Sequence, residues 1–123
     1  MKFNPRVSSK PGKVRKALYT ATVHQKYKMM SSRLTKEAQK ETGIKVLPIH
    51  KGDEVVVMRG KHRSLTGKVT EVSRRKMRVC IENIDRENSK QQKKPIFFPP
   101  CALRITKPFV TETRQAVLDR RHH

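Results

Sequence analysis

The chain has 123 residues, of which 30 are Lys or Arg and 10 are Asp or Glu, giving a formal charge of +20. A compact protein with this excess repels itself, so a polyanion is the favoured partner: nucleic acid first, an acidic membrane surface second. With 34% hydrophobic residues and no Trp, the chain can fill one small core, and we expect part of it to be ordered only by a partner.

Several protein classes are not indicated. No stretch approaches the roughly 18 apolar residues of a membrane span, and the charged start MKFNPRVSSKPGKVRK lacks the apolar region of a secretory signal. Cys80 and Cys101 form no Cys-x-x-Cys motif, which predicts reduced intracellular thiols, with Cys80 buried. The histidines and carboxylates show no catalytic or metal-ligand spacing, the terminal His122–His123 pair included. We therefore expect no enzyme, cofactor, metal or small-molecule substrate.

The first 36 residues contain ten Lys or Arg and no Asp or Glu. Pro5, Pro11 and Gly12 interrupt the first third of this segment, and apolar periodicity is absent there, which predicts extended chain. A charge run of this kind is often only a solvated tail. Ten like charges in any ordered state need counter-charges, however, so we favour a tail that folds against phosphate.

Two short helices are predicted next. Val23, Tyr27, Met30 and Leu34 recur at helical spacing, so a helix from about residue 20 to 31 would pack this stripe on a core and present a basic face. A second helix should run over 36–42. The residues that indicate this helix are Thr35 as its N-cap, Glu37 in its first turn and Gly43 at its end. Beyond the helix, Pro48 requires extended chain.

Short apolar runs then predict about five strands in a mainly β domain. Their spacing fits a small antiparallel barrel that closes its own edges. The polar stretch 83–94 is expected to be a long loop, either functional or disordered, and 111–121 a helix with few apolar residues. The predicted organisation is a basic N-terminal extension (1–47), a barrel (48–106) and a C-terminal segment (107–123). The strand-forming runs are Val55–Met58, Val69 with Val72, the alternation of Met77, Val79 and Ile81, Ile96–Phe98, and Leu103–Ile105.

Basic residues gather in the predicted loops. One cluster brackets a loop between Gly60 and Gly67, and these glycines allow positive φ or close backbone approach to a phosphate. Each single residue could equally be a solvated surface side chain, but adjacent like charges destabilise a free fold. Zinc-finger, heptad and helix-turn-helix patterns are missing and aromatic residues are few, which favours structured RNA bound by shape and phosphate. The clusters are Arg59, Lys61, Arg63 and Lys68; Arg74, Arg75 and Lys76; and Lys90, Lys93 and Lys94.

The stretch KGDEVVVMRGKHRSLTGKVTEV, residues 51–72, resembles the KOW motif. The opening MKFNPRVSSKPGKVRKALYTA and the segment MSSRLTKEAQKETGIKVLPIHKGDEV resemble the eukaryotic and archaeal KOW-domain protein of the large ribosomal subunit, the universal L-twenty-four family. The resemblance covers at least residues 1–84 and fades after Asn83. It departs from the family at Ser64, where glycine is common, which leaves the conformation of the loop open but not its charge.

The resemblance implies an SH3-like (KOW) barrel with an extended basic N-terminal arm and short flanking helices. This barrel would bind large-subunit rRNA near the mouth of the peptide exit tunnel and support early subunit assembly, translation and contacts with neighbouring ribosomal proteins. Residues 2–16 would thread along rRNA, and Gly60, Lys61, His62, Arg63 and Gly67 would form the RNA-contacting loop. The location would be the cytoplasmic ribosome, with nucleolar assembly in a eukaryote.

We predict no membrane contact and no homo-oligomer. A KOW-type transcription-elongation or chromatin factor is the alternative, and a scaffold for an acidic protein is a third class. From charge and resemblance together, the residues predicted to contact RNA are Lys2, Arg6, Lys10, Lys13, Arg15, Lys16, His24, Lys26, Lys28, Arg33, Lys51, Arg59, Gly60, Lys61, His62, Arg63, Gly67, Lys68, Arg74, Arg75, Lys76, Lys93 and Lys94.

Overall fold

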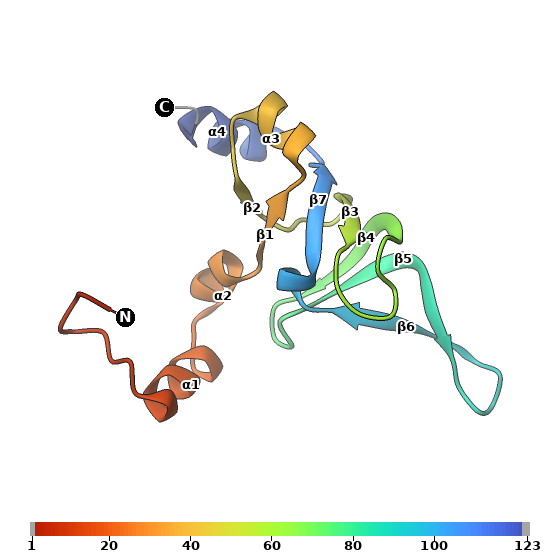
Figure 1. Ribbon diagram of the computed structural model, residues 1–123, viewed down its shortest axis with the longest axis horizontal. Helices are drawn as coiled ribbons and strands as arrows, with labels where there is room; N and C mark the ends of the chain where they lie inside the picture. The colour runs from red at the N-terminus through yellow and green to blue at the C-terminus, as the bar shows by residue number, and fades with distance from the viewer. Residues whose placement is uncertain (1, 122–123) are drawn as a thin grey trace.

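The computed structural model describes residues 2–121, in which seven strands form one mixed sheet with four α-helices around it (Figure 1). The strands lie in the order β2-β1-β7-β3-β4-β5-β6. The elements are α1 (Pro11–Tyr19), α2 (Val23–Met29), β1 (Ser31–Leu34), α3 (Lys36–Thr42), β2 (Val46–Pro48), β3 (Glu54–Val57), β4 (Thr66–Ser73), β5 (Arg78–Glu87), β6 (Lys93–Phe98), a 3-10 turn (Pro100–Ala102), β7 (Leu103–Lys107) and α4 (Glu112–Arg121).

One hydrophobic core lies on the inner face of the sheet. It takes Val55 and Val57 from β3 and Ile105 from β7, all almost completely buried, because alternate residues of a strand point to the same face. Leu34 joins them from β1 and Leu118 from α4. The sheet and the C-terminal helix therefore bury their apolar residues together.

Several predictions are confirmed. All five predicted strands are present as β3 to β7, and α3 has the predicted bounds, with Thr35 accepting a hydrogen bond from the Ala38 N–H and Gly43 in the left-handed conformation (φ 67°). The predicted C-terminal helix is α4. Cys80 is buried, as predicted, and Cys101 is exposed.

The prediction of extended chain is wrong over residues 11–16, which belong to α1. Pro11 does not interrupt the structure but occupies the first turn of the helix, where a missing N–H removes no helical hydrogen bond. The residues that follow, KVRKALY, include good helix formers. Helix α1 nevertheless buries no residue, and it stands with α2 to one side of the sheet (Figure 1).

The predicted apolar stripe of residues 20–31 is only partly correct. Helix α2 is shorter, from Val23 to Met29, and Val23 is 69% exposed. Met30 and Leu34 are buried, but they lie beyond the end of the helix. A turn after Met29 sends the chain into β1, so the stripe does not form one helical face.

The prediction of a closed, purely antiparallel barrel is not met. β1 pairs with β7 in parallel, and the pairings among residues 2–121 form an open row from β2 to β6. The sequence does not reveal β1 and β2 because they are only four and three residues long, and SSRL of β1 has no run of apolar residues. Pro48 lies at the end of β2, an edge strand, where a proline removes no ladder hydrogen bond.

The prediction of a long loop over 83–94 is also wrong. β5 continues to Glu87 and β6 begins at Lys93, so most of this stretch is a hairpin that projects from the molecule (Figure 1). The register shifts between Cys80 and Asp85, near Asn83, which has a φ of 61°. Both strands beyond this irregularity are largely exposed, so their sequence carries no apolar alternation.

Candidate nucleic-acid interface

Most of the residues predicted to contact RNA lie in four regions rather than one patch. The regions are the arm with α1 and α2, the loop 58–65 between β3 and β4, the β4–β5 turn and the β5–β6 hairpin. Outside these regions are Arg33 on β1, Lys51 before β3, and Gly67 and Lys68 on β4. The arm and the tip of the hairpin lie at opposite ends of the molecule (Figure 1). Nearly all these side chains are exposed, whereas Lys26, His62 and Gly67 are half-buried.

The loop 58–65 is held in one shape by its own backbone. Gly60 has a φ of 89°, and its carbonyl accepts a hydrogen bond from the Arg63 N–H at 3.2 Å. The Ser64 N–H donates to the Val57 carbonyl at 2.8 Å. Ser64 has a φ of 73°, so it adopts the left-handed conformation that glycine favours. Serine in place of the common glycine therefore does not prevent a left-handed turn.

The side chains of this loop divide into two kinds. The His62 ring packs edge-on against Phe98 of β6, with ring centroids 6.0 Å apart. Lys61 and Arg63, on either side of it, are exposed. The packing of His62 on Phe98 holds the loop in place. The exposed side chains of Lys61 and Arg63 can therefore both reach an anion in front of the loop.

Gly67 has a packing role in the structure. It lies in β4 opposite Val55, outside the positive-φ region. A Cβ atom there would stand 2.6 Å from Cγ2 of Ile81 and 3.0 Å from the carbonyl oxygen of Glu82. The close approach that requires glycine at this position is therefore the approach of β4 to β5.

Two cation–π contacts position the β4–β5 turn. The Arg74 guanidinium lies 5.4 Å from the centre of the Tyr27 ring on α2, and the Lys76 ammonium lies 5.8 Å from that of Phe97 on β6. The first contact joins the turn to α2, which carries Lys26 and Lys28. The contact brings the cluster of Arg74, Arg75 and Lys76 next to the helix that carries two other predicted RNA contacts, although the two are far apart in sequence.

One residue that lies among the basic side chains was missed from the sequence. Arg104 on β7 is the direct partner of Arg33 on β1. Its neighbours Leu103 and Ile105 are buried, so Arg104 faces outward. The alternation within LRITK indicates this orientation, but only the parallel pairing, which no local pattern encodes, places the two arginines side by side.

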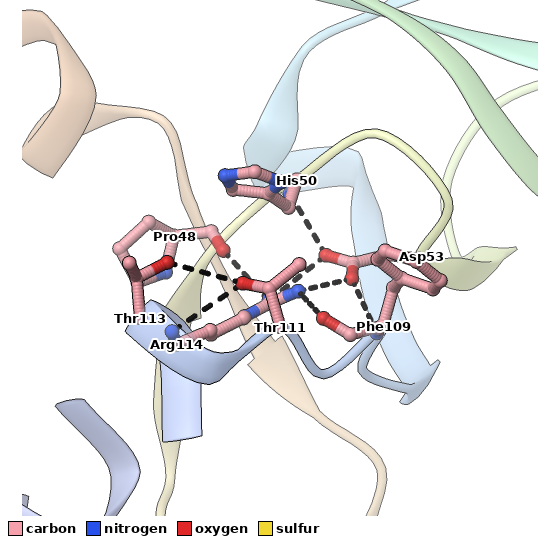
Figure 2. Close-up of polar contacts among 7 residues, drawn as sticks. All are labelled: Pro48, His50, Asp53, Phe109, Thr111, Thr113 and Arg114. Atoms are coloured by element: carbon pink, nitrogen blue, oxygen red, sulfur yellow. Dashed lines mark hydrogen bonds and ion pairs between the residues drawn. The ribbon is translucent and has the colours of Figure 1, made fainter. Parts of the chain in front are cut away.

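A buried ion pair ties the C-terminal segment to the sheet (Figure 2). Asp53 and Arg114 are 0% and 8% exposed, and both guanidinium NH groups donate to the carboxylate. The carboxylate also accepts from the His50 and Phe109 N–H groups, each at 2.8 Å. Arg114 donates further to the carbonyls of Phe109 and Pro48, at 2.8 and 3.0 Å. This pair was not foreseen.

Within residues 2–121, no group of three or more His, Cys, Asp or Glu side chains is placed to hold a metal ion. Nor is any helix of that span long and apolar enough to cross a bilayer. The prediction about the His122–His123 pair concerns residues outside those the structure describes. Among the described residues, the exposed Lys and Arg side chains of the loops and helices are the groups available to bind an anionic partner.

Comparison with known proteins identifies the family. The model of the family that comprises the eukaryotic ribosomal proteins L26 and their archaeal L24 counterparts matches residues 8–121. The chain belongs to this ribosomal protein family. Its membership confirms the resemblance found in the KOW-like motif and the N-terminal segments, and extends it over the C-terminal part, where that resemblance fades.

Individual members of the family agree. The Large ribosomal subunit protein uL24 of Caenorhabditis elegans is 41% identical over 121 residues, 98% of this chain and 85% of the relative. That of Korarchaeum cryptofilum is 38% identical over 115 residues, 93% and 88% of the two chains. The uL24A protein of Saccharomyces cerevisiae is 37% identical over 115 residues, 94% and 91% of the two. None of these names supports a transcription or chromatin factor.

Proposed function

We propose that this protein is a structural component of the large ribosomal subunit that binds rRNA by neutralising phosphates and by fixing the shape of folded RNA. The observation that carries the proposal is family membership over residues 8–121. The charge of +20 supplies the physical means, because cations on a protein release the counterions condensed on RNA.

The loop 58–65 is the proposed centre of RNA binding. Its backbone hydrogen bonds and the packing of His62 on Phe98 hold it in place before RNA arrives, so little conformational entropy is lost on binding. Arg63 offers a planar fork that matches two phosphate oxygens, while Lys61 acts as a mobile point charge. The sheet sets the direction in which both project.

The proposal also covers the organisation of the chain, its place in the ribosome and its partners. The proposed organisation is an SH3-like arrangement of the strands in 48–106, preceded by an N-terminal extension over 1–47 that follows rRNA and followed by a C-terminal segment over 107–123. We further propose a place near the peptide exit tunnel, a role in subunit assembly and neighbouring ribosomal proteins as partners. The protein acts as one copy, without catalysis, in cytoplasmic ribosomes, with nucleolar assembly in a eukaryote. Family membership and the exposed cations support these features.

The double substitution Lys61→Glu with Arg63→Glu tests the loop. We expect it to weaken binding to large-subunit rRNA by more than about tenfold, because two charge-assisted contacts become repulsive. Thermal unfolding should change little, since both side chains are exposed. The measurement is filter binding alongside circular dichroism.

The matched control is Arg120→Glu with Arg121→Glu on α4, which makes the same change in net charge at two exposed arginines outside the N-terminal extension and the predicted contact loops. We expect a much smaller loss of affinity from the control. Equal losses in the two variants would show that only total charge matters and that the loop is not the centre of the interface.

A further inference from the structure

A groove of about 520 Å³ lies on the outer face of the sheet, near the ends of β1 and β7. It is large enough to hold part of a nucleotide, since binding sites for small ligands span roughly 300–1,000 Å³. Three arginines from three separate segments line it: Arg33 on β1, Arg59 after β3 and Arg104 on β7.

The sheet itself aligns two of these arginines. Arg33 pairs with Val46 of β2 on one side and with Arg104 on the other, and Arg104 pairs in turn with Val56 of β3. Paired residues in a sheet point to the same face and their strands lie about 4.8 Å apart. The side chains of Arg33 and Arg104 therefore leave the same outer face at neighbouring positions, and both line the groove.

The third arginine is fixed by the chain around it. The Met58 N–H donates to the Ala102 carbonyl at 2.8 Å, which holds the residue before Arg59 against the 3-10 turn. The buried Ser32 hydroxyl donates to the carbonyl of Pro100 in the same turn. These contacts tie three walls of the groove together, so its shape does not depend on a ligand.

The groove has no counter-charge of its own. None of its lining residues is acidic, and neither ion pair among residues 2–121, Lys107–Glu54 and Arg114–Asp53, involves the three arginines. Like charges directly opposite each other in a sheet destabilise it. An anion held between them would remove that repulsion and accept hydrogen bonds from several guanidinium groups.

We propose that this groove binds a phosphodiester group of folded RNA, held by Arg33, Arg59 and Arg104, with Val46 and Met58 as apolar contacts for the attached sugar or base. The inference rests on the proposed function, and it adds a specific pocket and a contact residue, Arg104, to the loop 58–65. The phosphate chemistry could also come from free phosphate or a mononucleotide, so the test separates these sources.

Cys101 provides a local reporter, because its exposed thiol lines the groove, whereas the Cys80 thiol is buried. The experiment measures the rate at which N-ethylmaleimide alkylates each cysteine of the full chain, read by mass spectrometry. The rate is compared for free protein and for protein with large-subunit rRNA, inorganic phosphate or adenosine 5′-monophosphate. We expect rRNA to slow alkylation of Cys101 severalfold, with Cys80 slow throughout.

Variants connect protection to the arginines. Arg104→Gln should weaken rRNA binding about tenfold and partly restore alkylation of Cys101 in the complex. Arg59→Gln should act in the same way, and because Arg59 is exposed it keeps the test valid even if Arg104→Gln unfolds. Arg120→Gln on α4 removes the same charge at an exposed site and should change affinity by no more than about twofold.

The outcomes are distinct. Protection by rRNA that is lost in both groove variants supports the proposal, whether or not the free phosphates also protect. If the chain binds rRNA but Cys101 stays reactive, or if only free phosphate or mononucleotide protects it, the groove is not an RNA site and the proposed function still stands. If the unaltered chain fails to bind rRNA at all, the proposed function fails as well.

Discussion

Breaking the buried pair of Asp53 and Arg114 should be one of the most destabilising single changes in this fold. The carboxylate accepts four hydrogen bonds, two from the guanidinium and one each from the His50 and Phe109 N–H groups. Asp53→Asn preserves the size of the side chain. It removes the negative charge, however, and places amide hydrogens among groups that only donate.

The expected loss follows from the burial. Removing one partner leaves Arg114 charged, 8% exposed and without its counter-charge, a situation that costs about 3–5 kcal/mol. The whole fold is expected to be stable by only about 5–15 kcal/mol. A loss of about 4 kcal/mol should lower the Tm by about 15 °C in a domain of this size.

The assay is urea unfolding of the full chain, followed by circular dichroism, with a double-mutant cycle. Arg114→Met should cost about 3 kcal/mol, because it leaves the carboxylate with only its two backbone donors. The double variant should lose clearly less than the sum of the single losses, with a coupling energy of about 2 kcal/mol. High salt should change these values little, since the pair is shielded from water.

The chain contains its own control in the exposed pair of Glu54 and Lys107. Their atoms are 4.0 Å apart and their side chains 42% and 78% exposed. Glu54→Gln should therefore cost less than about 0.5 kcal/mol. The reasoning is refuted if Asp53→Asn costs no more than Glu54→Gln, or if the two single losses simply add.

Three further substitutions or deletions test other parts of the account. Gly67→Ala should destabilise the fold by about 1–2 kcal/mol in urea unfolding, because its Cβ would lie 2.6 Å from Ile81; a stabilised variant would show that β4 moves away freely. Ser64→Gly should stabilise by about 0.5–1 kcal/mol by relieving the left-handed backbone at φ 73°, and a loss measured by the same unfolding would mean that the hydroxyl has a role. Deleting residues 2–16 should flatten the salt dependence of rRNA binding; an unchanged slope would mean that the arm does not contact phosphate.

Local signals in the sequence account for much of the fold. The helix 36–42 was predictable because Thr35 and Gly43 mark its two ends, and β3 to β7 because short apolar runs show where chain is buried. The role of Pro11 could not be predicted, because a proline can either prevent a helix or begin one. The sequence around it does not show which of the two applies.

Non-local pairing accounts for most of what was missed. β1 is a strand because β2 and β7 flank it, and SSRL alone has no strand pattern. The same pairing brings Arg104 beside Arg33. Arg114 looks like one more solvated cation in the sequence, and only the packing of α4 brings it to Asp53. The exposure of the basic loop residues could be predicted from the sequence, whereas their contact with RNA stays a prediction.

The dependence of rRNA affinity on salt is the most direct test of the central claim that folded RNA neutralises this protein. The full chain is titrated with large-subunit rRNA by filter binding over a series of salt concentrations. If about ten phosphates are contacted, the logarithm of the association constant should fall against that of the salt concentration with a slope of about −7 to −9. A slope near zero, or no binding at physiological ionic strength, would contradict the account.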